Sequence, residues 1–388
     1  MLAFRSFFLF VVCQSLFIGC SAPKSESLEP LVAGIKERFA PDQRVALFKI
    51  DVKNQDGSLV LKGETTLPDA KQALFDSLSV RKIAVVDSIR VLPDTTIGEK
   101  PWGLVTLSVG NIRVAPDLAA EMATQLLLGT PVKILQRVDS WYRVQSPDKY
   151  IGWCDERVLA PLTQADLAVW KQSDRYIYRG NNGFAFSEAE SRSSVVSDLV
   201  LGDLFAVSGE EKGFLRMQFP DGRTGFVQKN ECQLYSEWIV EEPKVDQAIE
   251  TAKMLTGSPY LWGGTSTKGV DCSGLIKTAY FSEGVILARD ASQQARYGEI
   301  LSVTDSLDFQ PGDLLFFGKS KERISHVAMY IGNGKYIHSS GLVRINSLNA
   351  QDPDYSESHR KRLVSAGRII HSLNTEEIVQ VKAHPWYN

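Results

Sequence analysis

Apolar and polar residues near the start of the chain follow the pattern of a small α+β domain. Helical spacing at 31–39 and 69–78, and alternation typical of strands at 44–52, 58–65 and 82–92, predict its elements. An Asp-Gly turn joins the first two strands. About 65 residues suffice for such a domain to fold. Because no chemistry-bearing residues cluster in it, we expect a spacer or docking unit.

Residues 100–236 contain the same alternating pattern of apolar and polar residues twice. The stretch "LLLGTPVKIL…SWYRV…YIGW" matches "LVLGDLFAV…GFLRM…RTGF", with Gly129 and Gly202 at equivalent places 73 residues apart. Short strands separated by Gly and Asp turns predict two small all-β barrels. Their sequence pattern resembles that of the bacterial SH3-like domains of cell-wall enzymes. Two β modules that bind no ligand would show the same pattern.

A different pattern begins at Pro243 and continues over about 130 residues, a typical domain size. The stretch "KVDQAIETAKML" has the spacing of an amphipathic helix. A Gly-rich loop at 257–269, a second helix and several strands follow. This part of the chain is therefore expected to be an α+β domain.

Cys272 stands where the second helix of this domain should begin. In "GVDCSGL", Asp271 is a good N-cap, which makes Cys272 the first helical residue. Unpaired N–H groups at a helix start favour thiolate over thiol, so we expect an activated nucleophile. The alternatives are a buried structural thiol, half of a disulfide and a metal ligand.

Two histidines are expected close to each other in a hairpin. The stretch "ISHVAMYIGNGKYIHSS" predicts two strands around a Gly-Asn-Gly loop, and a three-residue loop would pair Ile331 with Lys335. His326 then lies diagonally opposite His338 on one face of the sheet. This arrangement suits a base, His326, that takes the thiol proton while His338 orients it.

Several motifs together resemble a known family. "GSPYLWGGTSTKGVDCSGL", "RDASQQ", "PGDLLFF", "ISHVAMYIGNGKYIHSS" and "LVSAGRII" occur in the order found in the NlpC-type papain-like cysteine peptidases of bacterial cell-wall peptides. The resemblance spans roughly residues 243–371. It implies a papain-like fold, Cys272 as nucleophile, His326 as general base and His338 as the orienting third member. It implies no cofactor.

The resemblance also implies a substrate. Enzymes of this family hydrolyse the γ-D-glutamyl bond to a diamino acid in murein peptides, and two preceding SH3-like modules resemble the dipeptidyl-peptidase VI type, which takes free peptides beginning L-Ala-γ-D-Glu. A buried substrate ammonium needs a carboxylate partner. We expect Asp290, Glu121 and Tyr150 at the amine, and Ser273 and Ser292 at the free α-carboxylate. Tyr260 matches the family's active-site tyrosine, and Trp262 follows it in the same predicted substrate site.

Three other functions remain open. One is an endopeptidase that remodels intact peptidoglycan, and another is a related Cys-His amidase, which usually takes Asn or Glu as its third residue. The third is a non-catalytic wall-binding lipoprotein with an inactive peptidase domain. The intact set of Cys272, His326 and His338 favours a peptidase over the last of these.

Composition and cysteine positions limit which partners, metal sites and disulfides are expected. The net charge of −3 gives no reason to expect a nucleic-acid partner. No Cys-x-x-Cys or His-Glu-x-x-His pattern occurs, so a zinc hydrolase is not expected and we predict no metal site. Cys154 and Cys232 occupy non-equivalent places in the repeat, which favours two separate thiols.

The amino terminus resembles an export signal. "MLAFRSFFLFVVCQSLFIGC" has one Arg and an apolar stretch too short for a comfortable membrane span. It resembles a bacterial lipoprotein signal peptide cleaved before Cys20, which would carry the lipid, although Phe17 stands where Leu is usual. A plain secretory signal is the alternative. Both place the mature protein outside the cytoplasm, in the periplasm or cell envelope, and we expect a monomer.

The whole chain is therefore predicted to be α+β: a papain-like (NlpC-type) catalytic domain preceded by two small all-β SH3-like barrels and a small N-terminal α+β domain. The expected boundaries are a signal peptide at 1–19, a linker at 20–30, the small α+β domain at 31–95, SH3-like domains at 96–165 and 170–240, and the peptidase domain at 243–374.

Overall fold

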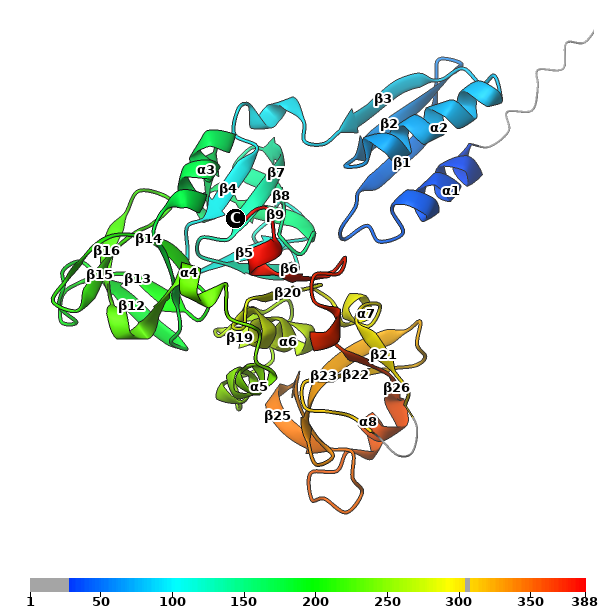
Figure 1. Ribbon diagram of the computed structural model, residues 1–388. Coiled ribbons are helices and arrows are strands. Elements are labelled where there is room, and N and C mark those ends of the chain that lie inside the picture. The colour runs from blue at the N-terminus through cyan, green and yellow to red at the C-terminus, as the bar shows by residue number, and fades with distance from the viewer. Residues whose placement is uncertain (1–27, 304–307) are drawn as a thin grey trace, which may run out of the picture.

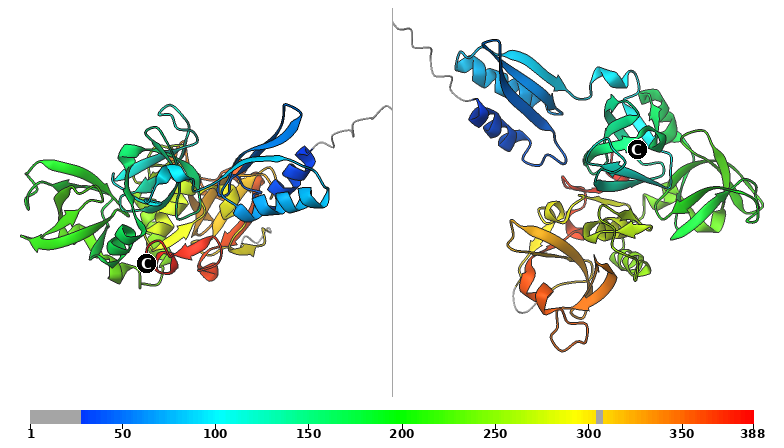
Figure 2. Two further views of the ribbon diagram at one scale, coloured as in Figure 1. Left: turned by 90° about the horizontal axis from the view of Figure 1, so that it is seen from above. Right: turned by 180° about the vertical axis from the view of Figure 1, so that it is seen from behind.

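A computed structural model describes residues 28–303 and 308–388 of the chain, which form four units (Figure 1). The predicted signal peptide and Cys20 lie outside these residues. None of the helices in the described ranges is long and apolar enough to cross a membrane. In Figure 2 the second β module and the N-terminal domain lie at opposite ends of the molecule, with the first β module between them.

The N-terminal domain packs two helices against a three-stranded sheet, as the apolar pattern predicts. Its elements are α1 (Glu29–Phe39), β1 (Phe48–Gln55), β2 (Ser58–Thr65), α2 (Pro68–Val80) and β3 (Val86–Val91). Strand β2 is antiparallel to β1 and parallel to β3. Asp56 and Gly57 close the hairpin with φ of 51° and 80°, as a type I′ turn requires.

The first strand begins later than the alternation predicts. Residues 44–47 belong to a loop, because the Asp42 side chain accepts the Arg44 amide at 3.0 Å and turns the backbone there. This loop, residues 40–47, points towards the rest of the molecule.

The two β modules have the same strand order. The first consists of β4 (Trp102–Val105), β5 (Val109–Arg113), β6 (Met122–Leu127), β7 (Pro131–Val138), β8 (Trp141–Gln145), β9 (Ile151–Asp155) and β10 (Leu159–Leu162). The second consists of β11 (Arg175–Tyr178), β12 (Asn182–Phe186), β13 (Val195–Val200), β14 (Leu204–Glu211), β15 (Phe214–Gln218), β16 (Thr224–Gln228) and β17 (Cys232–Leu234). The orders are β10-β4-β7-β8-β9-β5-β6 and β17-β11-β14-β15-β16-β12-β13, and every strand of the second module starts 73 residues after its counterpart.

Equivalent turns of the two modules pack against each other. The Leu204 amide donates to the Leu128 carbonyl at 3.0 Å, and the Leu128 amide donates to the buried Asp203 carboxylate at 3.1 Å. Gly129 is required here, since a Cβ at its φ of +72° would lie 2.2 Å from the Leu204 carbonyl oxygen. Helix α3 (Gln164–Gln172) follows the first module and α4 (Tyr235–Trp238) follows the second.

The fourth unit is an α+β domain built on an antiparallel six-stranded sheet. The strand order is β21 (Glu299–Leu301), β26 (Leu363–Arg368), β22 (Leu314–Gly318), β23 (Ile324–Gly332), β24 (Lys335–Ser340) and β25 (Leu342–Ser347). Its helices are α5 (Val245–Met254), α6 (Cys272–Phe281), α7 (Ala291–Gln294) and α8 (Glu357–Arg362). One buried apolar cluster joins α5 and α6 to this sheet. A short pair, β18 (Thr265–Ser266) and β19 (Gly269–Val270), precedes α6.

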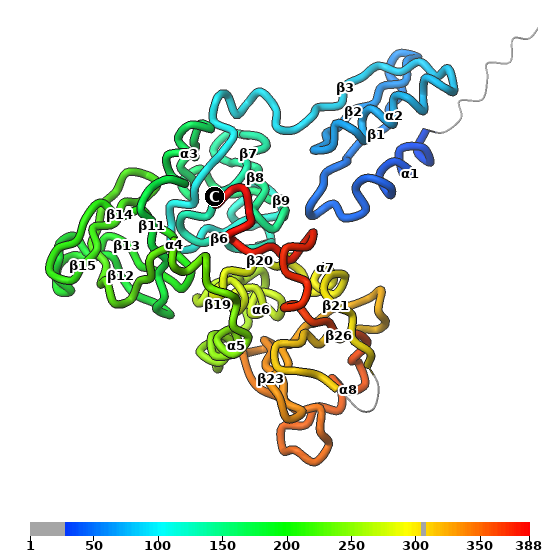
Figure 3. The backbone as a smooth tube through the Cα atoms, in the orientation of Figure 1, coloured from blue at the N-terminus to red at the C-terminus, as the bar shows by residue number. Residues whose placement is uncertain are grey.

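The last residues of the chain return to the first module, beyond the boundary predicted at 374. Strand β27 (Ile378–Gln380) pairs with β20 (Val285–Leu287), and the following residues run back over the first module (Figure 3). Tyr387 is buried there, and its carbonyl accepts from Arg175 at 3.0 Å. The C-terminal segment therefore joins the peptidase-like domain to both β modules.

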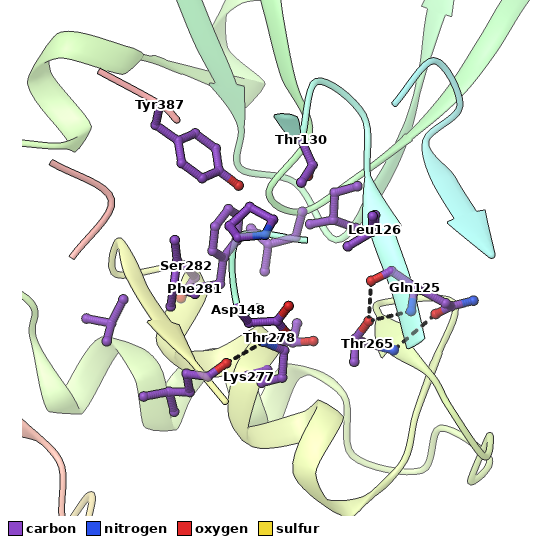
Figure 4. A pocket seen from close by; sticks show the side chains of 16 residues that line it. Gln125, Leu126, Thr130, Asp148, Thr265, Lys277, Thr278, Phe281, Ser282 and Tyr387 are labelled. Carbon is purple, nitrogen blue, oxygen red and sulfur yellow. Dashed lines mark hydrogen bonds and ion pairs between the residues drawn. The ribbon is translucent and has the colours of Figure 1, made fainter. Parts of the chain in front are cut away.

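A small cavity of about 70 Å³ lies between the first module and α6 (Figure 4). Lys277 of α6 reaches Asp148 of the first module at 2.8 Å; Asp148 is buried and Lys277 is half-buried. The residues that line this cavity, all in the described part of the chain, do not include Cys272, His326 or His338. The cavity lies where the first module meets the fourth unit, away from the predicted catalytic residues.

Candidate active site

Cys272 is the first residue of α6, as predicted. Asp271 is the N-cap, and its Oδ1 accepts the Gly274 amide at 2.7 Å. Its Oδ2 accepts the Gly263 amide at 3.0 Å, which fixes the preceding Gly-rich loop. The Cys272 side chain is therefore held by a capped helix start, and it is 8% exposed.

The helix start does not lower the pKa of Cys272 as the sequence analysis expects. Burial and then the Asp271 carboxylate raise the pKa of Cys272 to about 11, although the backbone N–H groups of Val327 and Ser273 lower it. The capping residue is itself an anion beside the sulfur, and a buried site disfavours the charged form. At neutral pH the group is a thiol, and it needs a base to become a nucleophile.

The hairpin that carries the two histidines has the predicted register away from its turn. Met329 pairs with Ile337 and Tyr330 with Tyr336, whereas Lys335 pairs with Gly332 and not with Ile331. A bulge at Ile331 takes up the extra residue, which leaves two residues in the turn. The register behind the bulge brings His326 Nε2 within 2.8 Å of His338 Nδ1.

A chain of hydrogen bonds fixes the tautomer of both histidines. The Asn346 amide nitrogen donates to the Asp354 carbonyl at 2.8 Å, which turns Oδ1 of Asn346 towards His338 Nε2 at 2.9 Å. His338 must therefore carry its proton on Nε2 and accept at Nδ1. His326 donates from Nε2, and its Nδ1 keeps a free lone pair. That nitrogen is the base the thiol needs.

The environment keeps this base neutral. Burial, followed by the neighbouring His338 and His359, lowers the pKa of His326 to about 3. Burial likewise lowers the pKa of His338 to about 4, against the Asn346 hydrogen bond, which raises it. Both imidazoles are therefore uncharged at neutral pH, so His326 can accept a proton there.

Packing places the thiol next to the strand that carries the base. Helix α6 lies against β23, and Cys272 shares a buried cluster with Val327, the residue after His326. Within the described part of the chain no hydrogen bond joins the thiol to His326. Such contacts commonly tighten only when substrate binds.

His359 and Asn346 belong to the site and were missed by the sequence analysis. The ring of His359, on α8, stacks on His326 at 5.5 Å and stands perpendicular to His338 at 4.9 Å. Its Nδ1 lies 2.7 Å from the Tyr336 hydroxyl. No motif marks either residue, since each reaches the histidine pair from a separate element of the fold.

The three histidines bring ligand-type nitrogens within 4.8 Å of one another. The rings of His326 and His359 are nearly parallel, with an interplanar angle of 10°. Because a ring nitrogen binds a metal in the plane of its ring, two stacked parallel rings cannot direct both lone pairs to one ion. Nε2 of His338 and Nδ1 of His359 also have other partners. The cluster is arranged for proton transfer and not for metal binding.

Buried polar groups surround the helix start. Arg289 donates to both oxygens of Asp271, at 2.5 Å and 3.2 Å, and to Ser273 Oγ at 3.0 Å. Ser273 is buried and also bonds Asp271, so its hydroxyl serves this network in the structure. Burial and then Cys272 raise the pKa of Tyr260, whose backbone bridges to Val270 just before the cap. The Cys272 amide makes no hydrogen bond within the described residues and can stabilise an oxyanion.

The residues predicted at the substrate amine take part in two separate contacts between the first module and the fourth unit. Glu121 accepts from the indole of the exposed Trp262 at 2.6 Å. Tyr150 is buried, and burial and then Asp290 raise the pKa of its hydroxyl, which places the two side chains together. Glu121 contacts neither of them in the described structure. Asp290 also caps α7.

Comparison with known proteins gives a consistent result. Residues 257–368 match the NlpC/P60 family, and residues 112–159 match the bacterial dipeptidyl-peptidase Sh3 domain. The chain is 29% identical over 287 residues to dipeptidyl-peptidase 6 of Lysinibacillus sphaericus, covering 69% of this chain and 98% of that protein. It is 30% identical over 259 residues to gamma-D-glutamyl-L-lysine dipeptidyl-peptidase of Bacillus cereus, covering 62% and 74%. The crystal structure of a Bacillus cereus NlpC/P60 family protein has the same fold, with a TM-score of 0.60 and 24% identity over 69% of this chain and 99% of that one.

Proposed function

Because the chain belongs to the NlpC/P60 family of cysteine peptidases, we propose that it hydrolyses the bond between γ-D-glutamate and a diamino acid in murein peptides with a free N-terminal L-Ala. The observation that carries the proposal is the hydrogen-bond chain from Asn346 through His338 to His326 beside Cys272. The names of the two relatives support the substrate class.

The reaction follows from the tautomers. His326 Nδ1 takes the proton of the Cys272 thiol as the sulfur attacks the γ-carbonyl carbon. The Cys272 amide stabilises the oxyanion, and the imidazolium of His326, stabilised by His338, gives its proton to the departing amine of the diamino acid. Water, deprotonated by His326, then attacks the thioester carbonyl and releases the L-Ala-γ-D-Glu part, and the proton on His326 returns to the departing Cys272 sulfur.

The amine end of the substrate is assigned to the junction with the first module. Asp290 supplies the carboxylate that an ammonium needs, and Tyr150 from the first module lies beside it. A peptide still joined to glycan through its L-Ala has no ammonium to place there. The contacts of the first module thus favour free peptides over intact peptidoglycan.

The test is turnover of L-Ala-γ-D-Glu-diaminopimelate, with both products followed by mass spectrometry. We expect Cys272→Ala and His326→Ala to lose at least about 1,000-fold in kcat, and His338→Ala to lose less because it orients the base. Cys232→Ala is the matched control, since this partly buried thiol lies outside the site. Near-normal turnover by Cys272→Ala would remove the nucleophile from this mechanism.

The same proposal includes export and a lipid anchor at Cys20, which rest on the sequence of the amino terminus. Two or three acyl chains on one cysteine would anchor the protein stably, where one chain would be marginal. Mass spectrometry of the protein from membranes should show a mature chain that begins at an acylated Cys20. An unmodified Cys20 in soluble protein would refute the anchor.

A further inference from the structure

The loop at residues 40–47 of the N-terminal domain reaches the carboxylate assigned to the substrate amine. Arg44 Nη1 donates to Asp290 Oδ2 at 2.8 Å and to Ser292 Oγ at 3.3 Å. Asp42 of the same loop accepts from Gln293 Nε2 at 2.9 Å. A domain that the sequence marks only as a spacer or docking unit thus contacts three polar side chains at the start of α7.

The first module holds the backbone of this loop in place. The Ile151 amide donates to the Arg44 carbonyl at 2.7 Å, and Gln145 Nε2 donates to the Val45 carbonyl at 3.1 Å. Leu47 packs into a small buried cluster with Leu135 of the first module. The main chain at Arg44 is therefore fixed, and the position of its guanidinium depends on side-chain rotation.

The guanidinium of Arg44 has the chemistry of the group that Asp290 is expected to bind. It is a cation that donates N–H hydrogen bonds to the carboxylate, as a substrate ammonium would. Its remaining N–H groups donate to Asp42, from Nε at 2.8 Å and from Nη2 at 2.6 Å. The side chains of Arg44 and Asp290 are 36% and 28% exposed, so the ion pair can open without disturbing a core.

We infer that Arg44 is a specificity-determining residue that competes with the substrate's free amine for Asp290. The inference rests on the proposed function and deepens it. When the ammonium binds, Arg44 releases Asp290 and keeps Asp42 as its partner. Without ligand, Arg44 at 2.8 Å is the closer of two cations beside Asp290, since Arg289 Nη1 lies 3.9 Å from the same carboxylate. The N-terminal domain thereby weakens the binding of every free-amine peptide and leaves amine-blocked peptides unaffected.

The experiment measures binding separately from hydrolysis. L-Ala-γ-D-Glu and its N-acetyl form are titrated calorimetrically into the Cys272→Ala protein, with and without Arg44→Met, which removes the charge and keeps most of the length. We expect Arg44→Met to lower the Kd of the free dipeptide about tenfold, the worth of one charge-assisted hydrogen bond. The Kd of the N-acetyl form should stay the same. Arg44→Lys should remain close to the parent, and so should the control Arg81→Met at an exposed position of the same domain.

Three results would overturn the inference. One is an unchanged or weaker affinity of Arg44→Met for the free dipeptide. Another is an equal gain for both dipeptides, which would mean that the cleft has opened without any competition for charge. The third is no binding of either dipeptide to any variant, which would remove the ammonium site itself. Turnover of the substrate by the wild-type chain tests the proposed function separately. The peptidase can be active even if Arg44 has no effect on dipeptide binding.

Discussion

The two β modules share a fold and a turn, but among the described residues only the turn of the first module contacts the peptidase domain. The turn is Pro147-Asp148-Lys149-Tyr150 in the first module and Pro220-Asp221-Gly222-Arg223, 73 residues later, in the second. In the first, Asp148 is buried against Lys277 and Tyr150 lies beside Asp290. In the second, Asp221 pairs with Arg223 at the surface, with 33% and 35% of the side chains exposed.

This difference shows how one copy of a repeat gains a role that the other copy lacks. The backbone is the same in both, since Lys149 and Gly222 both have positive φ, 65° and 87°. The two turns differ in the part of the molecule that each contacts. Arg223 Nη2 donates to the Thr106 carbonyl of the first module at 2.7 Å, so the second module uses this turn to hold the first. The first module uses it to contact Lys277 and Asp290 of the peptidase domain.

The largest difference between the modules should appear in stability. Asp148→Asn leaves the half-buried Lys277 charged and without its anion, and we expect a loss of about 3 kcal/mol in the free energy of unfolding. Asp221→Asn breaks an exposed pair and should cost under about 1 kcal/mol. Urea unfolding followed by tryptophan fluorescence measures both.

A double variant separates charge burial from packing in that pair. Asp148→Asn combined with Lys277→Met removes the unpaired charge and should recover most of the lost stability. Equal losses in Asp148→Asn and Asp221→Asn would mean that the two turns are energetically alike, against the contrast drawn between the modules.

A smaller effect is expected on catalysis from Tyr150. Tyr150→Phe removes the hydroxyl beside Asp290 and should lower kcat/KM for the free-amine peptide about tenfold. The N-acetylated peptide should be hydrolysed at the same rate by this variant and the wild type. Arg223→Ala, at the equivalent place of the second module, should change neither rate. A matching loss in Arg223→Ala would assign the effect to loosened modules instead of the amine.

The smallest effect is expected at Glu121. Glu121→Gln keeps an oxygen that can accept from the Trp262 indole and removes only the charge. We expect a two- to fivefold loss in kcat/KM for the free-amine peptide, because an exposed charge acts weakly across solvent. Ser194→Ala, 73 residues later, is the control. A loss as large as that of Tyr150→Phe would place Glu121 directly on the amine.

Much of the site was predictable because its signals are local. Asp271 caps α6 as expected, and the hairpin pattern brought His326 and His338 together despite an error of one pair at the turn. The 73-residue repeat predicted two modules of one topology. The thiolate expectation failed because a local rule about helix starts ignores burial and the charge of the cap.

The remaining parts of the site depend on contacts between elements distant in sequence. Asn346 and His359 reach the histidine pair from β25 and α8, and nothing in their own segments indicates it. Arg44 contacts Asp290 across 246 residues. Such contacts follow from how units dock, which periodicity and motif spacing do not encode.

The central claim is that the first module and the peptidase domain together recognise a free amine next to the Cys272 site. The most direct test compares kcat/KM of the wild-type chain for L-Ala-γ-D-Glu-diaminopimelate with a free and with an acetylated amino terminus. Acetylation removes the cation and leaves the Asp290 carboxylate without a substrate partner, so the account predicts a preference of at least about 30-fold for the free peptide. Equal kcat/KM values for the two peptides would contradict it.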